Sequence, residues 1–403
     1  MKTPLFISGV LLLFVCSCEP LSVNFKNGES RFFHQSPRAL SSFRDSVTVS
    51  GSDACYYTAV SFPSDYNWRR DTSYGAVQAT INLYKDDSLL LQIPTGTLAS
   101  PDADMHHFIH GHLYTQFRVG GRTVLSKDGE PILELGREAI LAGLLPLNGK
   151  LYTLWQNRGG EGFSLLEGST ELFSRSRGKP LGSTALSAYA PYGALYPDLG
   201  KPCFCYRNGS EWYVVRETQE STVSKLQGKV YDMRSFDGKV FVFQLDNSKA
   251  SFHYKETLLN FSLSQNNYSE TGYIYTENGK PYCVGIAYQG QNTAQTFCLV
   301  GFMSGQSVSL PGSDVCRLSS NPLILQFFSS DGETGYYSQS TGIKNLEGRF
   351  YHLSPHTGIR VNGKLILALN PMEYGKKPFL WKDGEIQELD LNGFISGIYQ
   401  SSQ

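Results

Sequence analysis

The sequence predicts an all-β protein folded as a single β-propeller of eight four-stranded blades, with seven blades as the alternative count. A short turn, Asn148-Gly149-Lys150, recurs along the chain, and apolar, aromatic-rich runs follow its copies. Asn-Gly or Asp-Gly between such runs favours a type I′ hairpin, because both central residues of that turn need φ > 0. A hairpin repeated about every 40 residues, with no helical pattern between the copies, is typical of propeller blades. The abundance of Tyr, Phe and Gly supports strands and tight turns.

The spacing of the turns sets the blade count. From Gly111 onward the glycines are separated by 38, 51, 38, 41 and 84 residues. Because 84 is twice 42, a degenerate copy is expected near Asn321-Pro322. The long interval of 51 residues and the degenerate copy leave seven blades open. The copies are His110-Gly111, Asn148-Gly149, Leu199-Gly200, Asp237-Gly238, Asn278-Gly279 and Asn362-Gly363.

A second turn follows the first within each repeat, so that each repeat holds four strands. The intervals Gly111 to Gly129, Gly149 to Gly168 and Gly363 to Gly384 are 18, 19 and 21 residues. The arrangement resembles kelch-type propellers in strand order but lacks their paired glycines. That order places the strand before each first turn innermost. The expected inner strands are 105–109, 139–147, 187–195, 228–236, 271–276, 313–320 and 356–361.

The first and last strands of the chain are expected to share a blade. The first set has three strands, 55–61, 74–84 and 89–93, and lacks an inner one. A lone strand, 394–399, ends the sequence. If the C-terminal strand completes the first blade, the ring closes and leaves no exposed sheet edge.

The N-terminus has the features of an export signal. Lys2 precedes an apolar run from Leu5 to Val15, which is too short for a membrane span of about 20 residues. Val15-Cys16-Ser17-Cys18 resembles the lipobox of bacterial lipoproteins, and the segment as a whole is similar to lipoproteins of gut Bacteroidetes. The resemblance implies a signal peptide over 1–17, lipidation of Cys18 and an outer-membrane location, with the periplasmic or surface face undetermined. Ordinary signal-peptide cleavage beside an incidental cysteine is the alternative.

We therefore expect three segments: the signal peptide (1–17), a tether (18–50) without periodicity, and the propeller (51–403). The net charge of -1 gives no reason to expect nucleic acid as a partner. Membrane contact is expected through the lipid anchor. No cofactor is expected.

The cysteines suit an oxidising compartment. Cys283 and Cys298 are expected on neighbouring strands of one blade and are the favoured disulfide pair. Cys203 and Cys205 lie on one strand at a separation poorly suited to bonding each other. The alternative for all of them is a set of buried free thiols. No C-x-x-C pair indicates zinc.

Four of the eight histidines lie between His106 and His112. If His110-Gly111 forms the turn, Ile109 pairs with His112 and His107 pairs with Tyr114. The four imidazoles then do not converge, so no metal site is predicted. His106 and His107 begin an inner strand, where they could face a ligand at the rim of the channel.

The loops that enter the inner strands, and those that join second to third strands, should lie on one face around the channel. Arginine and aromatic residues gather in these loops. Arg recognises anionic or planar groups, and Trp or Tyr rings suit sugars and other rings. The predicted ligand-binding residues are Trp68, Arg69, Arg70, His106, His107, Arg122, Arg158, Tyr189, Tyr192, Arg207 and Tyr374.

The leading hypothesis is a lipid-anchored, non-enzymatic propeller that binds a small ligand or nutrient on this rim, beside an outer-membrane transporter. The resemblance to Bacteroidetes lipoproteins implies siderophores, corrinoids and glycans as ligand classes. One alternative is an envelope scaffold that holds another protein, and a second is a glycan-active hydrolase or lyase. Catalysis is not favoured, because the G-x-S-x-G and H-E-x-x-H motifs do not occur.

Overall fold

A computed structural model describes 22 stretches of the chain, all within the second of its two compact units, Phe33–Gln403. The described residues form strands and turns, and no helix occurs among them. In this part of the chain there is accordingly no helix that is long and apolar enough to cross a membrane. The described residues are 38–39, 54–69, 79–86, 88–96, 106–119, 122–136, 139–157, 161–181, 194–224, 226, 229–246, 249–254, 256–262, 267–277, 280–289, 297–302, 307–311, 314–320, 323–328, 334–338, 340–351 and 357–400.

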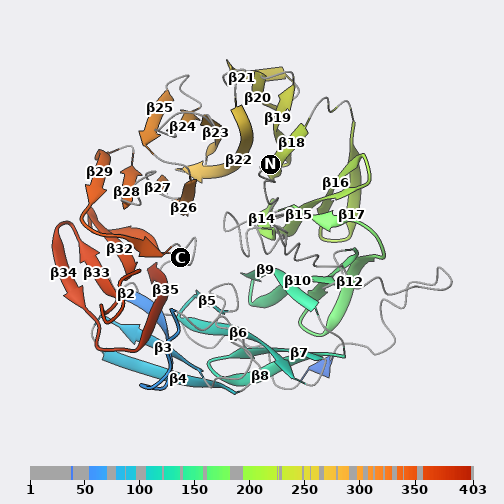
Figure 1. Cartoon of the computed structure of the whole chain (residues 1–403). Helices are drawn as coiled ribbons and strands as arrows, with labels where there is room; N and C mark the ends of the chain where they lie inside the picture. The colour runs from blue at the N-terminus through green and yellow to red at the C-terminus, as the bar shows by residue number, and fades with distance from the viewer. Residues whose placement is uncertain are drawn as a thin grey trace, which may run out of the picture. The chain divides into compact units, whose positions relative to one another are not determined.

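The described strands form eight antiparallel sheets, most of them built from strands consecutive in sequence (Figure 1). The sheet of β2, β3, β4 and β35 joins the two ends of the fold, and the next sheet runs from β5 to β8 with β1 at its edge. These strands are β1 (Arg38–Ala39), β2 (Cys55–Ser61), β3 (Ala79–Lys85), β4 (Ser88–Gly96), β5 (His106–Ile109), β6 (His112–Val119), β7 (Arg122–Lys127), β8 (Glu130–Leu135) and β35 (Gly393–Gln400).

The remaining sheets follow in chain order. Two sheets comprise β9 (Ala139–Leu147), β10 (Lys150–Asn157), β11 (Phe163–Glu167) and β12 (Thr170–Arg175), then β13 (Lys179–Pro180), β14 (Tyr196–Asp198), β15 (Lys201–Asn208), β16 (Glu211–Arg216) and β17 (Gln219–Val223). Two more comprise β18 (Lys229–Phe236), β19 (Lys239–Asp246), β20 (Lys249–Tyr254) and β21 (Glu256–Ser262), then β22 (Asn267–Glu277), β23 (Lys280–Gln289), β24 (Phe297–Phe302) and β25 (Ser307–Pro311). The last two comprise β26 (Asp314–Ser320), β27 (Leu323–Phe328), β28 (Thr334–Ser338) and β29 (Gly342–Leu346), then β30 (Phe350–Tyr351), β31 (Gly358–Val361), β32 (Lys364–Pro371), β33 (Phe379–Lys382) and β34 (Glu385–Glu388). This repeated antiparallel sheet is a β-propeller architecture.

The predicted type I′ turns are present wherever the structure describes them. Asn148 and Gly149 have φ of 53° and 73°, and Asn362 and Gly363 have φ of 50° and 79°. Both central residues are therefore left-handed, as this turn requires. The same holds for His110-Gly111, Leu199-Gly200 and Asp237-Gly238. The copies expected at Asn278-Gly279 and Asn321-Pro322 lie outside the described residues.

An aspartate ties the second turn of several sheets back to the strand that follows the first turn. Asp128 donates its N–H to the Leu113 carbonyl at 2.7 Å and accepts the Leu113 N–H on Oδ1 at 2.8 Å. Asp383 makes the same pair with Leu365, and Asp86 makes it with Cys55. In the sheet of β14 to β17 the corresponding strand residue is Pro202, which has no N–H to satisfy, and the turn residue is Glu217. An aspartate therefore occupies the turn where the strand residue has an N–H to bond, and a glutamate occupies it where that residue is proline.

Six of the seven expected inner strands lie where the sequence places them, and one does not. The strand expected at 187–195 is displaced: β14 begins at Tyr196, Ala194 and Leu195 precede it outside any strand, and 187–193 lie outside the described residues. The strand is moved toward the turn because its three residues pair directly with Lys201 to Cys203 after the turn.

The C-terminal strand pairs with the first strand of the fold. β35 and β2 run antiparallel, with Tyr399 opposite Tyr56 and Gly393 opposite Ser61. β2 then pairs with β3 and β3 with β4, so that three strands from one end of the fold and one from the other make this sheet. Two residues of the expected tether, Arg38 and Ala39, pair with the outer strand β8.

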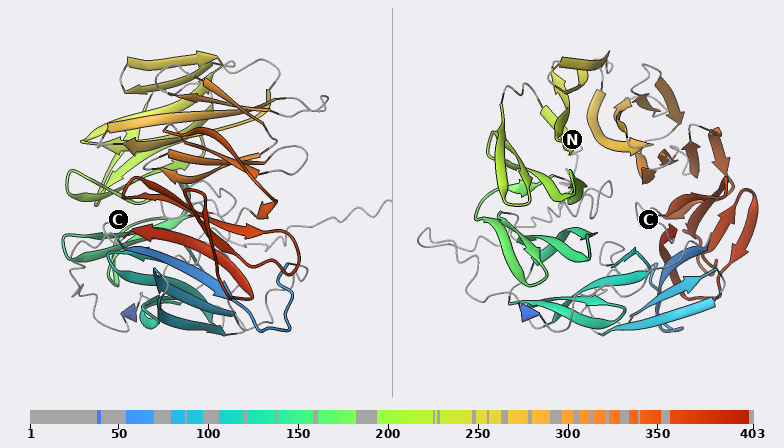
Figure 2. Two further views of the ribbon diagram at one scale, coloured as in Figure 1. Left: turned by 90° about the vertical axis from the view of Figure 1, so that its left-hand side faces the viewer. Right: turned by 180° about the vertical axis from the view of Figure 1, so that it is seen from behind.

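Consecutive sheets pack against each other through apolar clusters, and Figure 2 shows them side by side. Phe108 and Leu113 pack with Tyr56 and Phe394 between the first two sheets. Comparable clusters join four of the following pairs, and one between β32 and β35 returns to the first sheet. Between β18 and β22 a buried carboxylate contributes, because Asp232 Oδ2 accepts the Ile274 N–H at 2.7 Å.

Candidate binding site

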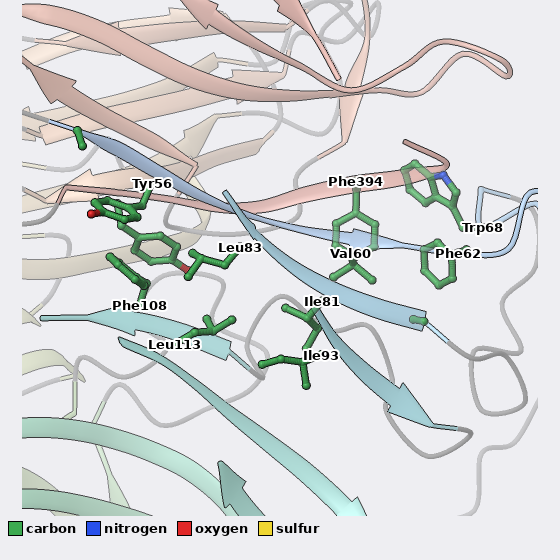
Figure 3. Close-up of a cluster of buried hydrophobic side chains, with 13 residues drawn as sticks. Tyr56, Val60, Phe62, Trp68, Ile81, Leu83, Ile93, Phe108, Leu113 and Phe394 are labelled. Atoms are coloured by element: carbon green, nitrogen blue, oxygen red, sulfur yellow. The ribbon is translucent and has the colours of Figure 1, made fainter. Parts of the chain in front are cut away.

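The expected rim residue Trp68 is part of the core. Its side chain is only 4% exposed and packs between Phe62 and Phe394, with ring centroids 6.5 and 5.4 Å away (Figure 3). The prediction of an open stacking platform at Trp68 is therefore wrong. The sequence places Trp68 in a loop, but the loop folds back and buries the indole among residues of β2 and β35.

Arg69 holds two neighbouring loops together. Its guanidinium lies 4.4 Å from the Trp68 ring centroid. Nε donates to the Pro371 carbonyl at 3.1 Å, and Nη2 donates to the Lys376 carbonyl at 2.6 Å. Arg69 thus braces the loop that carries Tyr374, whose side chain is 75% exposed. The structure therefore brings Trp68, Arg69 and the loop that carries Tyr374 close together.

Two other arginines that the sequence predicts to bind a ligand, Arg122 and Arg207, are exposed but contact side chains of their own sheets. Arg122 forms an ion pair with Glu134 at 2.8 Å. The Arg207 guanidinium lies 5.6 Å from the Trp212 ring centroid. Each contact is local, so neither arginine is shown converging with Arg69. Arg70, Arg158, Tyr189 and Tyr192, like Cys18, lie outside the described residues.

The histidine hairpin has the predicted register. His107 is opposite Tyr114 and Ile109 is opposite His112. His107 meets Tyr399 edge-on, and His106 begins β5. His112 Nδ1 lies 2.6 Å from Asp128 Oδ2, a contact that sequence spacing alone did not indicate. Within the described residues, no three His, Cys, Asp or Glu side chains form a metal-binding group.

The strand register contradicts the predicted disulfide. Cys298 on β24 lies opposite Tyr288, five residues beyond Cys283 on β23. At about 3.4 Å per residue the two cysteines are about 17 Å apart along the strands, whereas bonded Cα atoms lie about 4.4–6.8 Å apart. Cys283 is a buried free thiol, as are Cys55, Cys203 and Cys205. Burial raises the pKa of Cys55 and of Cys203 to about 12, which keeps these thiols protonated and unreactive.

An ion pair between Asp198 on β14 and Arg216 on β16 is hydrogen-bonded to the neighbouring sheet through Ser235 on β18. Asp198 accepts from Arg216 at 2.8 Å, from the Ser235 hydroxyl at 2.6 Å and from the Gly238 N–H at 3.0 Å. Burial opposes ionisation of Asp198, but these donors outweigh it and hold its pKa below the usual value. The cluster has the character of a structural tie between sheets.

A hollow lies between the outer strands of two neighbouring sheets, and we call it the cleft. One wall is β28 and β29 with the segment 346–350, and the other is β33 and β34. Its volume is about 570 Å³, within the range of small-molecule sites. In Figure 1 these strands are neighbours near the C-terminal end of the colour scale.

The floor of the cleft is aromatic. Tyr336 and Phe350 are buried, and Phe379 and Trp381 are half-buried against them. The ring centroids of Tyr336 and Trp381 lie 5.5 Å apart, and those of Phe350 and Phe379 lie 5.6 Å apart. Burial raises the pKa of Tyr336, with a smaller opposing effect from its bond with Thr341. The phenol therefore stays neutral at physiological pH.

The lips of the cleft are polar and exposed. Lys344, Asn345 and Glu347 line one side, and Asp383 lines the other beside the apolar Ile386. Asp383 Oδ1 accepts the Leu365 N–H, so that carboxylate is partly engaged by its own turn. Among the described residues, no hydrogen bond or ion pair joins Lys344 or Glu347 to the opposite lip. The cleft therefore combines ring faces below with donors and acceptors above.

Sequence reasoning missed the cleft. The signal in the sequence was the pair of alternating strands Thr334–Ser338 and Phe379–Lys382, each carrying an aromatic residue toward one face. Their convergence depends on sideways packing of two sheets, which local periodicity does not encode.

Comparisons with known proteins leave the function open. No family model matches the chain, and no curated protein matches it significantly. Among solved structures, apo AztD from Citrobacter koseri is 11% identical, covering 86% of this chain and 97% of its own, with a TM-score of 0.43. Kluyveromyces lactis Hsv2 is 10% identical over 68% of this chain and 95% of its own, with a TM-score of 0.37.

The WD40 domain of Toxoplasma gondii coronin is 8% identical over 78% of this chain and 84% of its own, with a TM-score of 0.35. Likenesses at this level carry no argument about ligand or partner. The class of the protein, a β-propeller, is defined by the strand pairing of this chain itself.

Proposed function

We propose that this chain is a non-enzymatic binding protein of the bacterial envelope, anchored by lipid at Cys18, that takes a small ligand into the cleft. The observation that carries the proposal is an open hollow of about 570 Å³ with an aromatic floor and polar lips. The rim is a weaker candidate, because Trp68 is buried and Arg69 is engaged with loop carbonyls.

Binding in the cleft is tested with the full-length protein extracted in detergent. Calorimetric titration with a ferric catecholate siderophore, cyanocobalamin and maltohexaose covers the three ligand classes. Binding of at least one is expected, with a loss of about tenfold or more in Trp381→Ala. Trp212→Ala is the matched control, since Trp212 is a half-buried tryptophan on another sheet. A ligand bound equally well by Trp381→Ala would contradict the cleft.

We further propose that the eight sheets are eight blades in a closed ring, with β35 as the inner strand of the first blade. The tie between β32 and β35 supports this arrangement. Asn370 Nδ2 donates to the Ile395 carbonyl at 2.9 Å, and Asn370 Oδ1 accepts the Ile395 N–H at 2.7 Å. Gln116 on β6 binds the backbone of the inner strand β9 in the same manner, through Ala139 and Leu141. β35 thus meets its neighbour as an inner strand does.

Truncation tests the closure. Removal of residues 393–403 should expose the edge of β2 and abolish cooperative unfolding, measured by urea titration and limited proteolysis. Removal of 401–403 alone is the control and should leave the transition unchanged. An unchanged midpoint in the longer truncation would refute closure by this strand.

Lipidation is tested by labelling cells with radioactive palmitate. The label should be present on the protein and absent from Cys18→Ala, which should leave the membrane fraction. Twenty residues separate Cys18 from Arg38 at the β8 edge, so the proposed anchor would hold this edge within about 70 Å of the bilayer. Persistence of the label in Cys18→Ala would refute the anchor.

A scaffold that holds another envelope protein is the second candidate, and one observation favours it. Met372 and Tyr374 are exposed by 46% and 75% on the loop that Arg69 braces. A rigid loop that presents apolar side chains suits a protein partner. A partner recovered with the full-length protein, lost in Tyr374→Ala and retained in Trp381→Ala, would favour the scaffold.

A further inference from the structure

The walls of the cleft differ in chemistry from its lips, and this difference restricts the ligand. Trp381 is half-buried, so Tyr336 covers part of the indole while the remainder faces the hollow. Ile386 on the next strand is 62% exposed and extends the same apolar wall outward. A ligand here meets a flat apolar surface on one side.

The opposite lip offers hydrogen bonds at short sequence intervals. Lys344 and Glu347 contribute a cation and a carboxylate, and Asn345 between them contributes an amide that both donates and accepts. These side chains are exposed and are not bonded to the far lip within the described residues. They are therefore available to groups that both donate and accept.

The charges of the side chains that line the cleft nearly cancel. Lys344 is opposed by Glu347 on its own lip and by Asp383 across the cleft. An anion such as a ferric catecholate or a sulfated chain would meet two carboxylates and one ammonium. One ammonium and two carboxylates sum to −1, a small surplus that disfavours an anion and gives a cation only a weak preference.

We infer that the cleft, if it is the binding site proposed above, takes an uncharged oligosaccharide. The C–H face of a pyranose ring packs on the exposed part of Trp381, and its hydroxyls, which donate and accept, bond to Asn345, Glu347 and Lys344. Ile386 is exposed beside this ring, so that a further sugar unit can extend outward past it. This inference rests on the proposed function and names its ligand class.

Trp381 also allows binding to be measured by tryptophan fluorescence. The chain has four tryptophans, and two of them, Trp68 and Trp155, are 4% and 1% exposed. The full-length protein in detergent is titrated with maltohexaose, cellohexaose and chitohexaose as uncharged probes. A heparin hexasaccharide and a chitosan hexamer serve as the anionic and cationic probes. Tryptophan emission and calorimetry are recorded on the same samples.

At least one uncharged probe should bind and change the emission. Trp381→Ala should weaken binding by about tenfold or more. Trp381→Phe keeps a ring but removes the fluorophore, so calorimetric binding should persist within about threefold while the emission change disappears. Trp212→Ala should behave as the parent protein.

The outcomes distinguish an error in the ligand class from an error in the site. Binding confined to the heparin or chitosan probe and lost in Trp381→Ala would overturn the uncharged class and leave the cleft as the site. Binding of an uncharged probe that is unchanged in Trp381→Ala would overturn both. If no saccharide binds while cyanocobalamin or the siderophore does so through Trp381, the saccharide class is refuted. Cleavage of a probe, detected by mass spectrometry, would replace binding with glycan hydrolysis.

Discussion

Two interfaces between neighbouring sheets have similar aromatic cores but differ at their outer strands. We call the boundary between the sheets of β9–β12 and β13–β17 the sealed interface, and that between β26–β29 and β30–β34 the open interface. Both have aromatic cores, with Phe163, Phe204 and Tyr206 in the first and Tyr336 and Phe350 in the second. They differ at the outer strands, where the gap between diverging sheets is widest.

At the sealed interface a bridge spans the outer strands. Arg175 on β12 forms an ion pair with Glu220 on β17 at 2.8 Å, and the Tyr206 hydroxyl donates to the same carboxylate at 2.5 Å. The inner strand β9 also lies close to the segment that precedes β14, because a Cβ at Gly143 would lie 2.4 Å from Cβ of Leu195. At the open interface the outer strands carry no such bridge among the described residues, and the gap is the cleft. The same repeat thus provides rigidity in one place and a hollow in another.

The largest difference should appear when the two cores are truncated. Phe163→Ala should destabilise the protein by about 3–5 kcal/mol, because a fully buried ring leaves a cavity between Phe204 and Tyr206. Phe379→Ala at the open interface should cost about 1.5 kcal/mol, since its ring is half-buried. Urea unfolding measures both. Equal losses would mean that the two interfaces are equally packed.

Breaking the bridge should have an intermediate effect that depends on pH. Glu220→Gln should cost about 1–3 kcal/mol at neutral pH, through the charged hydrogen bonds from Arg175 and Tyr206. Burial raises the pKa of Glu220, but these bonds outweigh it and the net pKa lies below the ordinary value of 4.5.

A carboxylate with a depressed pKa stabilises the fold above its unfolded pKa and loses that contribution as pH falls through its folded pKa. The stability difference between the parent protein and Glu220→Gln should therefore be constant above about pH 4.5 and shrink below it. Urea midpoints measured from neutral pH to about pH 3 test the sign. A difference that grew on acidification would contradict the bridge.

Removing the indole of the open interface should affect stability less and binding more. Trp381→Ala should cost about 1–2 kcal/mol, because the indole is only partly buried. The same change should weaken ligand binding by about tenfold or more. A loss of stability as large as that of Phe163→Ala would show that Trp381 is core rather than wall.

The smallest stability effect should come from closing the cleft. Ile386→Arg places a guanidinium opposite Glu347 and imitates the bridge of the sealed interface. Because Ile386 is 62% exposed, the free energy of unfolding should change by no more than about 0.5 kcal/mol. Ligand titration should nevertheless show lost binding. Ile343→Arg, on β29 and outside the cleft, is the control for added charge and should bind normally.

The repeat could be predicted from the sequence because its determinants are local. The turns at Asn148-Gly149 and Asn362-Gly363 depend on two residues each, and the register of β5 with β6 follows from the same kind of turn at His110-Gly111. The pairing of β35 with β2 followed from counting strands. The fate of Trp68 could not be predicted, because a loop aromatic folds inward or outward according to the space that distant β35 leaves.

The remaining errors share that cause. Cys283 and Cys298 lie on adjacent strands, as expected, but five positions out of register. The cleft depends on how far the edges of two sheets diverge, which arises from their twist and not from the alternation within either strand. Sequence pattern therefore predicted the strands and many of their partners, whereas the hollow arose between them.

The pairing of β35 with β2 also determines which sheet can be completed last during folding. Ser396 hydrogen-bonds to Thr58 at a sequence separation of 338 residues, and closing a flexible loop of that length costs about 5 kcal/mol of chain entropy. A chain that emerges from its N-terminus can complete the intermediate sheets as they appear, but the sheet containing its first long strand waits for its last. The sheet that begins the fold is then the last to be finished. Until then the edge of β2 is available to other chains, so the aggregation risk of this protein is concentrated in the final moments of its synthesis or export.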